Sequence, residues 1–268
     1  MKTANFWVQF DAYSEILRLQ GRPNPWLETL IELLVMTSGE YRLSKSQWID
    51  ISALIEGSVR AKKSMSADSQ LPWASGCKIF NTQIEVRRET TLEVAQRFIG
   101  ETNQVLVLNF ANGIQAGGGF LHRAATQEEL LCRASGLYAT LLGDPFYEYH
   151  RRQVAMESSD WVILSPKVPL FRGGNGALLR KPVLLDFVTC AAPFAPVVGL
   201  EKSAVLMRSR IGRVLAVAHA FEYLDIVLGA WGCGAFRNDS RRVAEEFKLA
   251  LASDFRGVFR RWIFAIAE

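Results

Sequence analysis

The sequence is poor in the residues from which several classes of protein are built. Its few cysteines form neither a CxxC pair nor a cluster with the three histidines; they are Cys77, Cys132, Cys190 and Cys233. A disulfide scaffold and a structural zinc site are therefore not expected, and free thiols in an intracellular protein are the simplest account. No apolar run approaches the roughly 18 residues that a membrane helix needs, and no secretory signal is recognisable. We expect a soluble, cytoplasmic protein.

The chain also lacks an excess of charge of either sign. Its 31 Lys and Arg and 27 Asp and Glu give a formal net charge of only +4 over 268 residues. This charge is too dilute to predict direct DNA binding through the phosphates. Hydrophobic residues make up 49% of the chain, which excludes intrinsic disorder, and the length suits one large domain with or without an accessory segment.

The first part of the chain differs in pattern from the rest. Apolar residues recur there at helical spacing, as at Phe6, Phe10, Tyr13 and Leu17, and no convincing strand is predicted. We therefore predict an N-terminal helical accessory segment over residues 1–75 and a second domain over residues 76–268.

The second domain alternates predicted strands with predicted helices, which indicates an α/β fold with a mostly parallel or mixed sheet covered on both faces. Thr90 and Glu93 have the spacing of a helix capping box, and Gly100 marks the end of that helix. The strands are expected at 78–86, 104–110, 161–164, 183–189, 223–228 and 258–266, and further helices at 127–142, 201–221 and 240–252.

Three consecutive glycines, Gly117–Gly119, follow the most apolar of the predicted strands. The run Val105–Leu108 is typical of a central strand buried on both faces, and ligands bind at the carboxyl ends of such strands. Glycines let a ligand approach the backbone, and their amides can form a nest for an anion. The alternative is a flexible or bulged turn without a ligand.

A helix with two adjacent glutamates begins shortly after these glycines. Thr126 and Glu129 have N-cap to N3 spacing, so the carboxylate of Glu129 could serve only to cap the helix. Adjacent residues on a helix point about 100° apart. If Glu128 and Glu129 are both functional, they must therefore have different roles.

A second glycine cluster, formed by Gly229, Gly232 and Gly234, follows another apolar strand and precedes a helix capped by Asp239 or Ser240. This arrangement suits a phosphate or diphosphate, because backbone amides and the helix dipole converge there. The spacing matches neither a Walker A loop nor the Rossmann fingerprint, and a simple tight turn is the alternative. Two such loops at one sheet edge favour a shared anionic ligand.

These segments together resemble one family. NFAN at 109–112, GGGF at 117–120, QEE at 127–129 and GAWGCGAF at 229–236 make the chain similar to the bacterial-type poly(ADP-ribose) glycohydrolases, which are macrodomain proteins. The resemblance implies a three-layer αβα macrodomain with a mixed central sheet and an N-terminal helical part. It also implies ADP-ribose or poly(ADP-ribose) as the ligand and hydrolysis of the ribose–ribose O-glycosidic bond. Acid and base catalysis of this reaction requires no metal, the sequence shows no His/Asp cluster to bind one, and we expect no cofactor.

The resemblance further implies roles for individual residues. Glu129 resembles the catalytic acid and base, Glu128 the residue that holds the ribose hydroxyls, and Asn112 a polar ribose contact. The resemblance implies further substrate contacts in three places: the glycine triplet Gly117, Gly118 and Gly119, the residue Gln127 of the QEE motif, and a diphosphate loop formed by Gly232, Cys233, Gly234, Ala235 and Phe236. Phe236 is expected beside the distal ribose.

Two positions depart from the pattern of many relatives. Gln115 and Ala116 stand where Asn-Pro is common, and Arg237 stands where a small residue is common. Both affect the expected substrate preference more than the reaction type. Two other functions therefore stay open: a hydrolase that removes single ADP-ribose groups, and a non-catalytic ADP-ribose reader. The intact QEE argues against the reader, which needs no acid.

Overall fold

A computed structural model describes residues 35, 39–44, 46–72, 79–99, 104–122, 124–153 and 156–267. The helices predicted at the start of the chain, around Phe6 to Leu17, lie outside these ranges. Within the described part, the expectation that no strand precedes residue 75 is wrong. Strands β1 (Glu40–Ser44) and β2 (Gln47–Asp50) form an antiparallel hairpin, and helix α3 (Ser52–Ala61) leads into strand β3 (Lys63–Met65).

These early strands are too short to give an alternating pattern of their own, and long-range contacts stabilise them. β3 pairs with residues 162–164, far along the chain, and Tyr41 of β1 packs with Phe171 in a small buried cluster. β3 thus belongs to the main sheet although it precedes the predicted domain boundary. The division of the chain at residue 75 stays a prediction.

The central sheet has seven strands in the order β3-β6-β7-β5-β8-β9-β4. The pairs from β7 to β4 are parallel, whereas β3 and β6 pair antiparallel with their neighbours, so the sheet is mixed. All six strands predicted in the second domain are present, with shifted ends: β4 (Gln83–Arg87), β5 (Leu106–Ala111), β6 (Val162–Arg172), β7 (Leu178–Ala191), β8 (Asp225–Gly229) and β9 (Arg261–Ala265).

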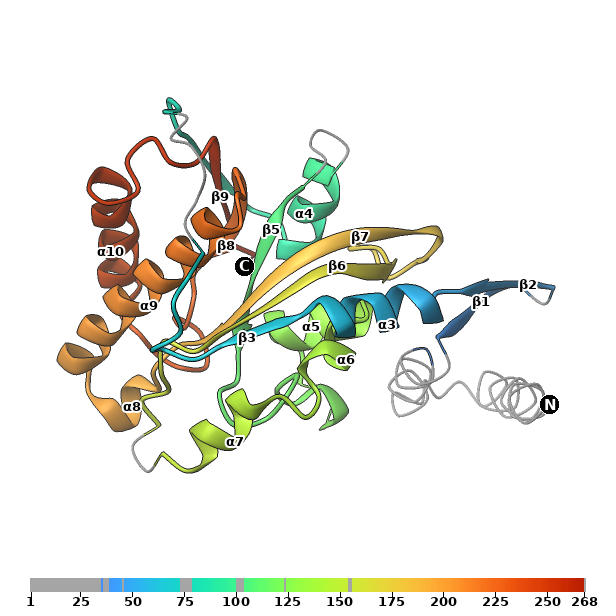
Figure 1. Cartoon of the computed structure of the whole chain (residues 1–268), viewed down its shortest axis with the longest axis horizontal. Coiled ribbons are helices and arrows are strands. Elements are labelled where there is room, and N and C mark those ends of the chain that lie inside the picture. Colours follow the sequence, from blue (N-terminus) through green and yellow to red (C-terminus); the bar gives the residue numbers. More distant parts are fainter. Residues whose placement is uncertain are drawn as a thin grey trace.

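Helices cover both faces of this sheet (Figure 1). Alternate residues of β5 belong to two different hydrophobic cores, one on each face of the sheet. Val107 belongs to the core formed with the helices α4 (Thr91–Ile99), α5 (Gln127–Ala134), α6 (Leu137–Leu141) and α7 (Pro145–Arg151). Leu106 belongs to the core formed with α9 (Leu200–Ala220) and α10 (Ser240–Ala252). The predicted three-layer αβα architecture is thereby confirmed. The short α8 (Ala195–Val198) precedes α9. None of the helices described in the structure combines the length and apolar character that crossing a membrane requires.

The helix predicted over residues 127–142 is in fact two helices. Ser135 is extended, with φ −145°, and forms an isolated antiparallel bridge with Leu170, while the Gly136 amide donates to the Pro169 carbonyl at 2.9 Å. Pairing with β6 therefore competes with helix continuation at this point. The break separates α5 from α6.

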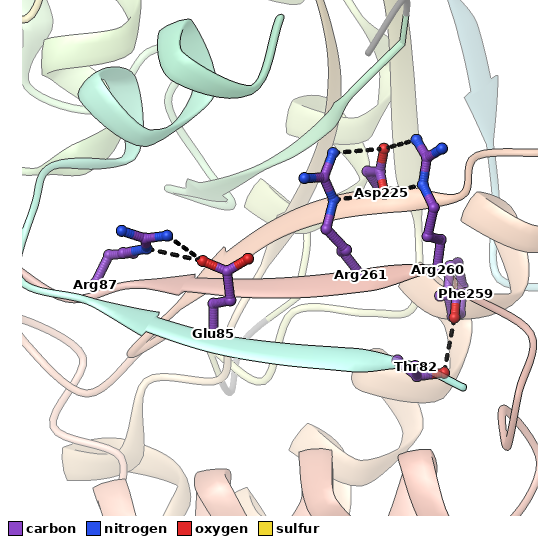
Figure 2. Close-up of polar contacts among 7 residues, drawn as sticks. All are labelled: Thr82, Glu85, Arg87, Asp225, Phe259, Arg260 and Arg261. Atoms are coloured by element: carbon purple, nitrogen blue, oxygen red, sulfur yellow. Dashed lines mark hydrogen bonds and ion pairs between the residues drawn. The ribbon is translucent and has the colours of Figure 1, made fainter. Parts of the chain in front are cut away.

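Two arginines hold together the starting ends of β8 and β9 (Figure 2). Gly229 and the loop after it lie at the opposite end of β8. Asp225, which is fully buried, accepts hydrogen bonds from Arg260 Nε at 2.9 Å and Arg261 Nε at 3.1 Å. Burial alone would raise the pKa of Asp225, but the hydrogen bonds from Arg260 and Arg261 outweigh it and hold the pKa below its usual value. Thr82 Oγ1 ties the start of β4 to the Phe259 carbonyl at 2.7 Å. These contacts give the starting ends of the strands a structural role. The glycine clusters lie at the opposite, carboxyl ends.

Candidate active site

The two glycine clusters lie at the same edge of the sheet. β5 and β8 are parallel neighbours, with Leu106 opposite Ile226 and Val107 opposite Val227. Gly117–Gly119 follow the carboxyl end of β5, and Gly229 ends β8. The structure thus confirms the predicted placement of both clusters at one edge of the sheet, and it shows in addition that their strands are adjacent.

The backbone of the glycine triplet lies directly against the paired glutamates. Gly117 and Gly118 have positive φ angles of 69° and 58°. A Cβ atom on Gly118 would lie 2.4 Å from Glu129 Oε1 and 3.0 Å from Glu128 Oε2. Only glycine satisfies both the left-handed conformation and this close approach.

Glu129 serves both as a helix cap and as a contact to the glycine triplet. Its Oε2 accepts hydrogen bonds from the Thr126 amide at 2.9 Å and from the Thr126 hydroxyl, which completes the predicted capping box. Its Oε1 accepts from the Gly119 amide at 2.8 Å. The side chain is 5% exposed. The cap therefore uses Oε2, while Oε1 contacts the glycine triplet.

Glu128 has a different environment, as the helix geometry predicts. It is 2% exposed, and it accepts hydrogen bonds from the Asn112 amide at 2.7 Å and from Asn109 Nδ2 at 3.3 Å. Burial raises the pKa of Glu128 to about 8; the charge of Glu129 adds to this effect, and the hydrogen bonds from Asn112 and Asn109 oppose it. Glu128 is therefore mostly protonated at neutral pH. Sequence reasoning gave Asn109 no role, although a polar residue that follows a buried apolar run was a usable signal.

The raised pKa of Glu128 predicts a pH-dependent contribution to stability. A glutamate in the unfolded chain has a pKa of about 4.3. Between about pH 4.3 and 8, the folded protein therefore binds more protons at this residue than the unfolded chain does. Raising the pH through this window should lower the free energy of unfolding by up to about 1.4 kcal/mol per pH unit. Urea unfolding of the wild type and Glu128→Gln across this range measures the effect.

The Glu128→Gln variant should lose that contribution and keep its fold. Asn109 faces Glu128 with its Nδ2, and a turn of its amide would bring Oδ1, which has no hydrogen-bond partner among the described residues, toward the new glutamine amide. An identical pH dependence in both proteins would contradict the protonation of Glu128.

Gln127 and Asn112 have structural contacts of their own. Gln127 accepts from the Phe110 amide at 2.9 Å and donates to the Leu108 carbonyl at 2.7 Å, which ties α5 to β5. Asn112 Oδ1 accepts from the amides of Ile114 and Gln115 at 2.9 and 3.1 Å, which shapes the start of the glycine loop. Their predicted contacts with substrate stay predictions.

The loop after β8 is built by residues that follow it in the chain. Gly232 has φ 73°, and a Cβ there would lie 2.7 Å from Asn238 Nδ2, which itself donates to the Pro193 carbonyl at 2.9 Å. Asp239 caps α10 by accepting from the amides of Arg241 and Arg242, so the first of the predicted caps is correct. Because Asp239 occupies these helix amides, an anion at this loop would be bound by loop amides.

A cavity of about 830 Å³ opens beside this loop and the start of α5. Of the predicted site residues, it is lined by Gln127, Gly232, Gly234, Ala235 and Phe236. The structure does not place the others on its wall: Asn112, Gly117, Gly118, Gly119, Glu128, Glu129 and Cys233. Thr126, whose amide donates to Glu129, lines the cavity, so the carboxylate pair lies close to this wall without forming part of it.

Two cavity residues, Arg133 and Arg172, were not predicted from the sequence. Arg133 lies in the last turn of α5 and Arg172 ends β6, far along the chain, so no local pattern joins them. In the part of the chain that the structure describes, no group of three or more His, Cys, Asp or Glu side chains could hold a metal ion.

An αβα sandwich with a glycine triplet against a buried carboxylate pair, and a second glycine-rich loop at the same end of the parallel strands, is the arrangement expected of a macrodomain-type hydrolase. A family model for the catalytic domain of microbial-type PARG matches residues 31–173. The chain therefore belongs to the microbial-type poly(ADP-ribose) glycohydrolase family, and the resemblance predicted from its motifs is confirmed.

Solved structures agree with this assignment. Poly(ADP-ribose) glycohydrolase from Thermomonospora curvata is similar at 37% identity and a TM-score of 0.83, over 90% of this chain and 92% of that chain. The same enzyme bound to the inhibitor ADP-HPD matches at 36% identity and a TM-score of 0.82, with the same coverage. The enzyme from Deinococcus radiodurans in complex with ADP-ribose matches at 33% identity and a TM-score of 0.74, over 82% of this chain and 92% of that chain. No curated protein matched the chain.

Proposed function

We propose that this chain hydrolyses the ribose–ribose O-glycosidic bond of poly(ADP-ribose) and releases ADP-ribose, with Glu129 as the general acid and base. The observation that supports the assignment of Glu129 is that its two carboxylate oxygens have different partners. Oε2 accepts from the Thr126 amide in the helix cap, and Oε1 accepts from the Gly119 amide. One oxygen is thereby held at the loop that contacts the ribose in our proposal. The other glutamate of the pair, Glu128, binds the ribose hydroxyls next to Glu129.

The reaction needs one proton for the leaving oxygen and one water for the sugar. Cleavage of a glycosidic bond passes through an oxocarbenium-like state. Protonated Glu129 donates its proton to the departing 2′-oxygen of the next unit as the bond to the anomeric carbon breaks. The resulting carboxylate then takes a proton from the water that attacks the anomeric carbon, which restores the acid.

The partners that follow from this function are poly(ADP-ribose) chains on modified targets, and we place the enzyme in the cytoplasm. The substrate-binding residues in this scheme are Gly117, Gly118, Gly119, Asn112 and Gln127 near the ribose, with the Gly232–Phe236 loop at the diphosphate. The lining of the cavity by Gln127 and most of that loop supports this arrangement.

Product analysis separates this function from the two alternatives. The protein is incubated with poly(ADP-ribose) and with a target that carries a single ADP-ribose, and released ADP-ribose is quantified by mass spectrometry. We expect free ADP-ribose from the polymer. Release from the single modification alone would instead indicate a mono-ADP-ribosyl hydrolase, and binding of polymer without any product would indicate a reader.

A further inference from the structure

The carbonyl groups of the Gly232–Phe236 loop are bonded to the rest of the protein. Alternate carbonyls each accept from a backbone amide: Gly232 from Asn238 at 3.0 Å, Gly234 from Arg237 at 2.9 Å, and Phe236 from Ala195 at 3.1 Å. In contrast, the amides of Gly234, Ala235 and Phe236 donate to no group in the part of the chain that the structure describes. The loop therefore has occupied acceptors and three donors that a ligand can use, which suits an anion.

Asn238 joins this loop to two other segments. Its side chain is buried, and its Nδ2 donates to the Gly232 carbonyl at 3.0 Å and to the Pro193 carbonyl at 2.9 Å. The hydroxyl of Ser203 donates to Asn238 Oδ1, which leaves Nδ2 for the two carbonyls. Pro193 follows the end of β7, and Ser203 lies in α9. One side chain thus fastens the loop after β8 to the segment after β7 and to a helix.

The Gly232 carbonyl is the group that this contact holds most directly. Gly232 has φ 73°, and a glycine in this conformation allows the adjoining peptide to rotate at low steric cost. Its carbonyl accepts from both the amide and the side chain of Asn238, so a rotated peptide would lose both hydrogen bonds. Because Gly232 lines the cavity, a carbonyl oxygen released from Asn238 can face a bound diphosphate and repel it.

We propose that Asn238 is a positioning residue, which keeps the carbonyls of the Gly232–Phe236 loop turned away from the ligand and its amides directed to the diphosphate. Asn238 does not line the cavity itself, so it acts through the loop. The identity of the ligand in this proposal rests on the proposed hydrolase function.

Replacing Asn238 with alanine tests the positioning role. The Kd of ADP-ribose, measured by calorimetric titration, should rise about tenfold or more, as for the loss of hydrogen bonds to a charged group. The KM for poly(ADP-ribose) should rise with it, whereas kcat should stay within about twofold, because contacts remote from the acid bind substrate and transition state alike. Ser203→Ala should give a smaller rise in Kd and KM, since Asn238 Nδ2 can still donate.

Ser58 provides a matched control for the loss of a buried hydrogen bond. Its side chain is 1% exposed, and its hydroxyl donates to the Lys167 carbonyl of a distant segment at 2.7 Å, away from the cavity wall. Ser58→Ala should lower the thermal unfolding temperature and leave the Kd of ADP-ribose, KM and kcat unchanged. A role of Asn238 in stability alone would give the same result.

An unchanged Kd in folded Asn238→Ala, or a fall in kcat without a rise in KM, would overturn the positioning role. If Asn238→Ala does not fold, Ser203→Ala decides, and an unchanged Kd in that variant overturns the role. The proposed function fails separately, when the wild type releases no ADP-ribose from the polymer. The comparison of Kd values tests Asn238 without any turnover.

Discussion

Replacing Glu129 with glutamine should lower kcat by about 10²–10⁴-fold, the usual contribution of a general acid and base. Binding of ADP-ribose should persist, because glutamine has nearly the size of glutamate and the proposed diphosphate contacts lie in the Gly232–Phe236 loop, which borders the cavity. The fold should persist as well, since glutamine also serves in capping boxes. Its amide group must nevertheless face either Gly119 or Thr126, both of which donate, so we expect a stability loss of about 1–3 kcal/mol. Single-turnover kinetics, calorimetric titration with ADP-ribose and urea unfolding measure the three effects.

Helix α4 supplies a matched control for this variant. Glu93 forms the same capping box: it accepts from the Thr90 amide and hydroxyl, each at 2.8 Å, and its own amide donates back to the Thr90 hydroxyl at 3.3 Å. It makes no contact with the glycine triplet. Glu93→Gln should therefore keep wild-type turnover and lose less stability than Glu129→Gln. A near-wild-type rate in Glu129→Gln would show that Glu129 serves only as a helix cap, and this result would contradict its proposed role as the acid and base.

The parts of this fold that the sequence predicts are those set by nearby residues. The apolar run Val105–Leu108 identifies a strand buried on both faces, and the spacing of Thr126 and Glu129 identifies the hydrogen bonds at the start of α5. Both signals depend on contacts within a few residues. They placed the glycine triplet correctly after a buried central strand and Glu129 correctly in the first turn of α5.

The parts that the sequence did not predict depend on distant partners. β3 is a strand because β6 pairs with it, and the predicted helix over 127–142 breaks because Ser135 bridges Leu170. The contact of Asn109 with Glu128 crosses from a strand to a helix, and Arg172 reaches the cavity from the end of a long hairpin strand. Local periodicity carries no information on such contacts, since they depend on the assembled sheet.

Replacing Gly118 with alanine should abolish most activity, because the new methyl group would meet both carboxylates. The added Cβ would lie 2.4 Å from Glu129 Oε1 and 3.0 Å from Glu128 Oε2, and φ of 58° is itself unfavourable for alanine. Either the loop or the Glu129 side chain must move, which breaks the hydrogen bond from the Gly119 amide. Displacement of a catalytic group by about 1 Å can lower the rate about 100-fold. Steady-state kinetics on poly(ADP-ribose) measure this loss.

The cost of the backbone conformation can be separated from the clash, because Gly143 has a similar φ of 67° and a Cβ there meets no atom within 4 Å. Gly143→Ala should therefore show only the conformational cost, about 1–2 kcal/mol of unfolding free energy, with unchanged turnover. Gly118→Ala should add a loss of activity that exceeds any loss explained by unfolding. If the two variants lose stability equally and both keep wild-type kcat, the close approach of the glycine triplet to the carboxylates has no catalytic role. A selective loss in Gly118→Ala instead ties the conformation of this loop to the position of the acid.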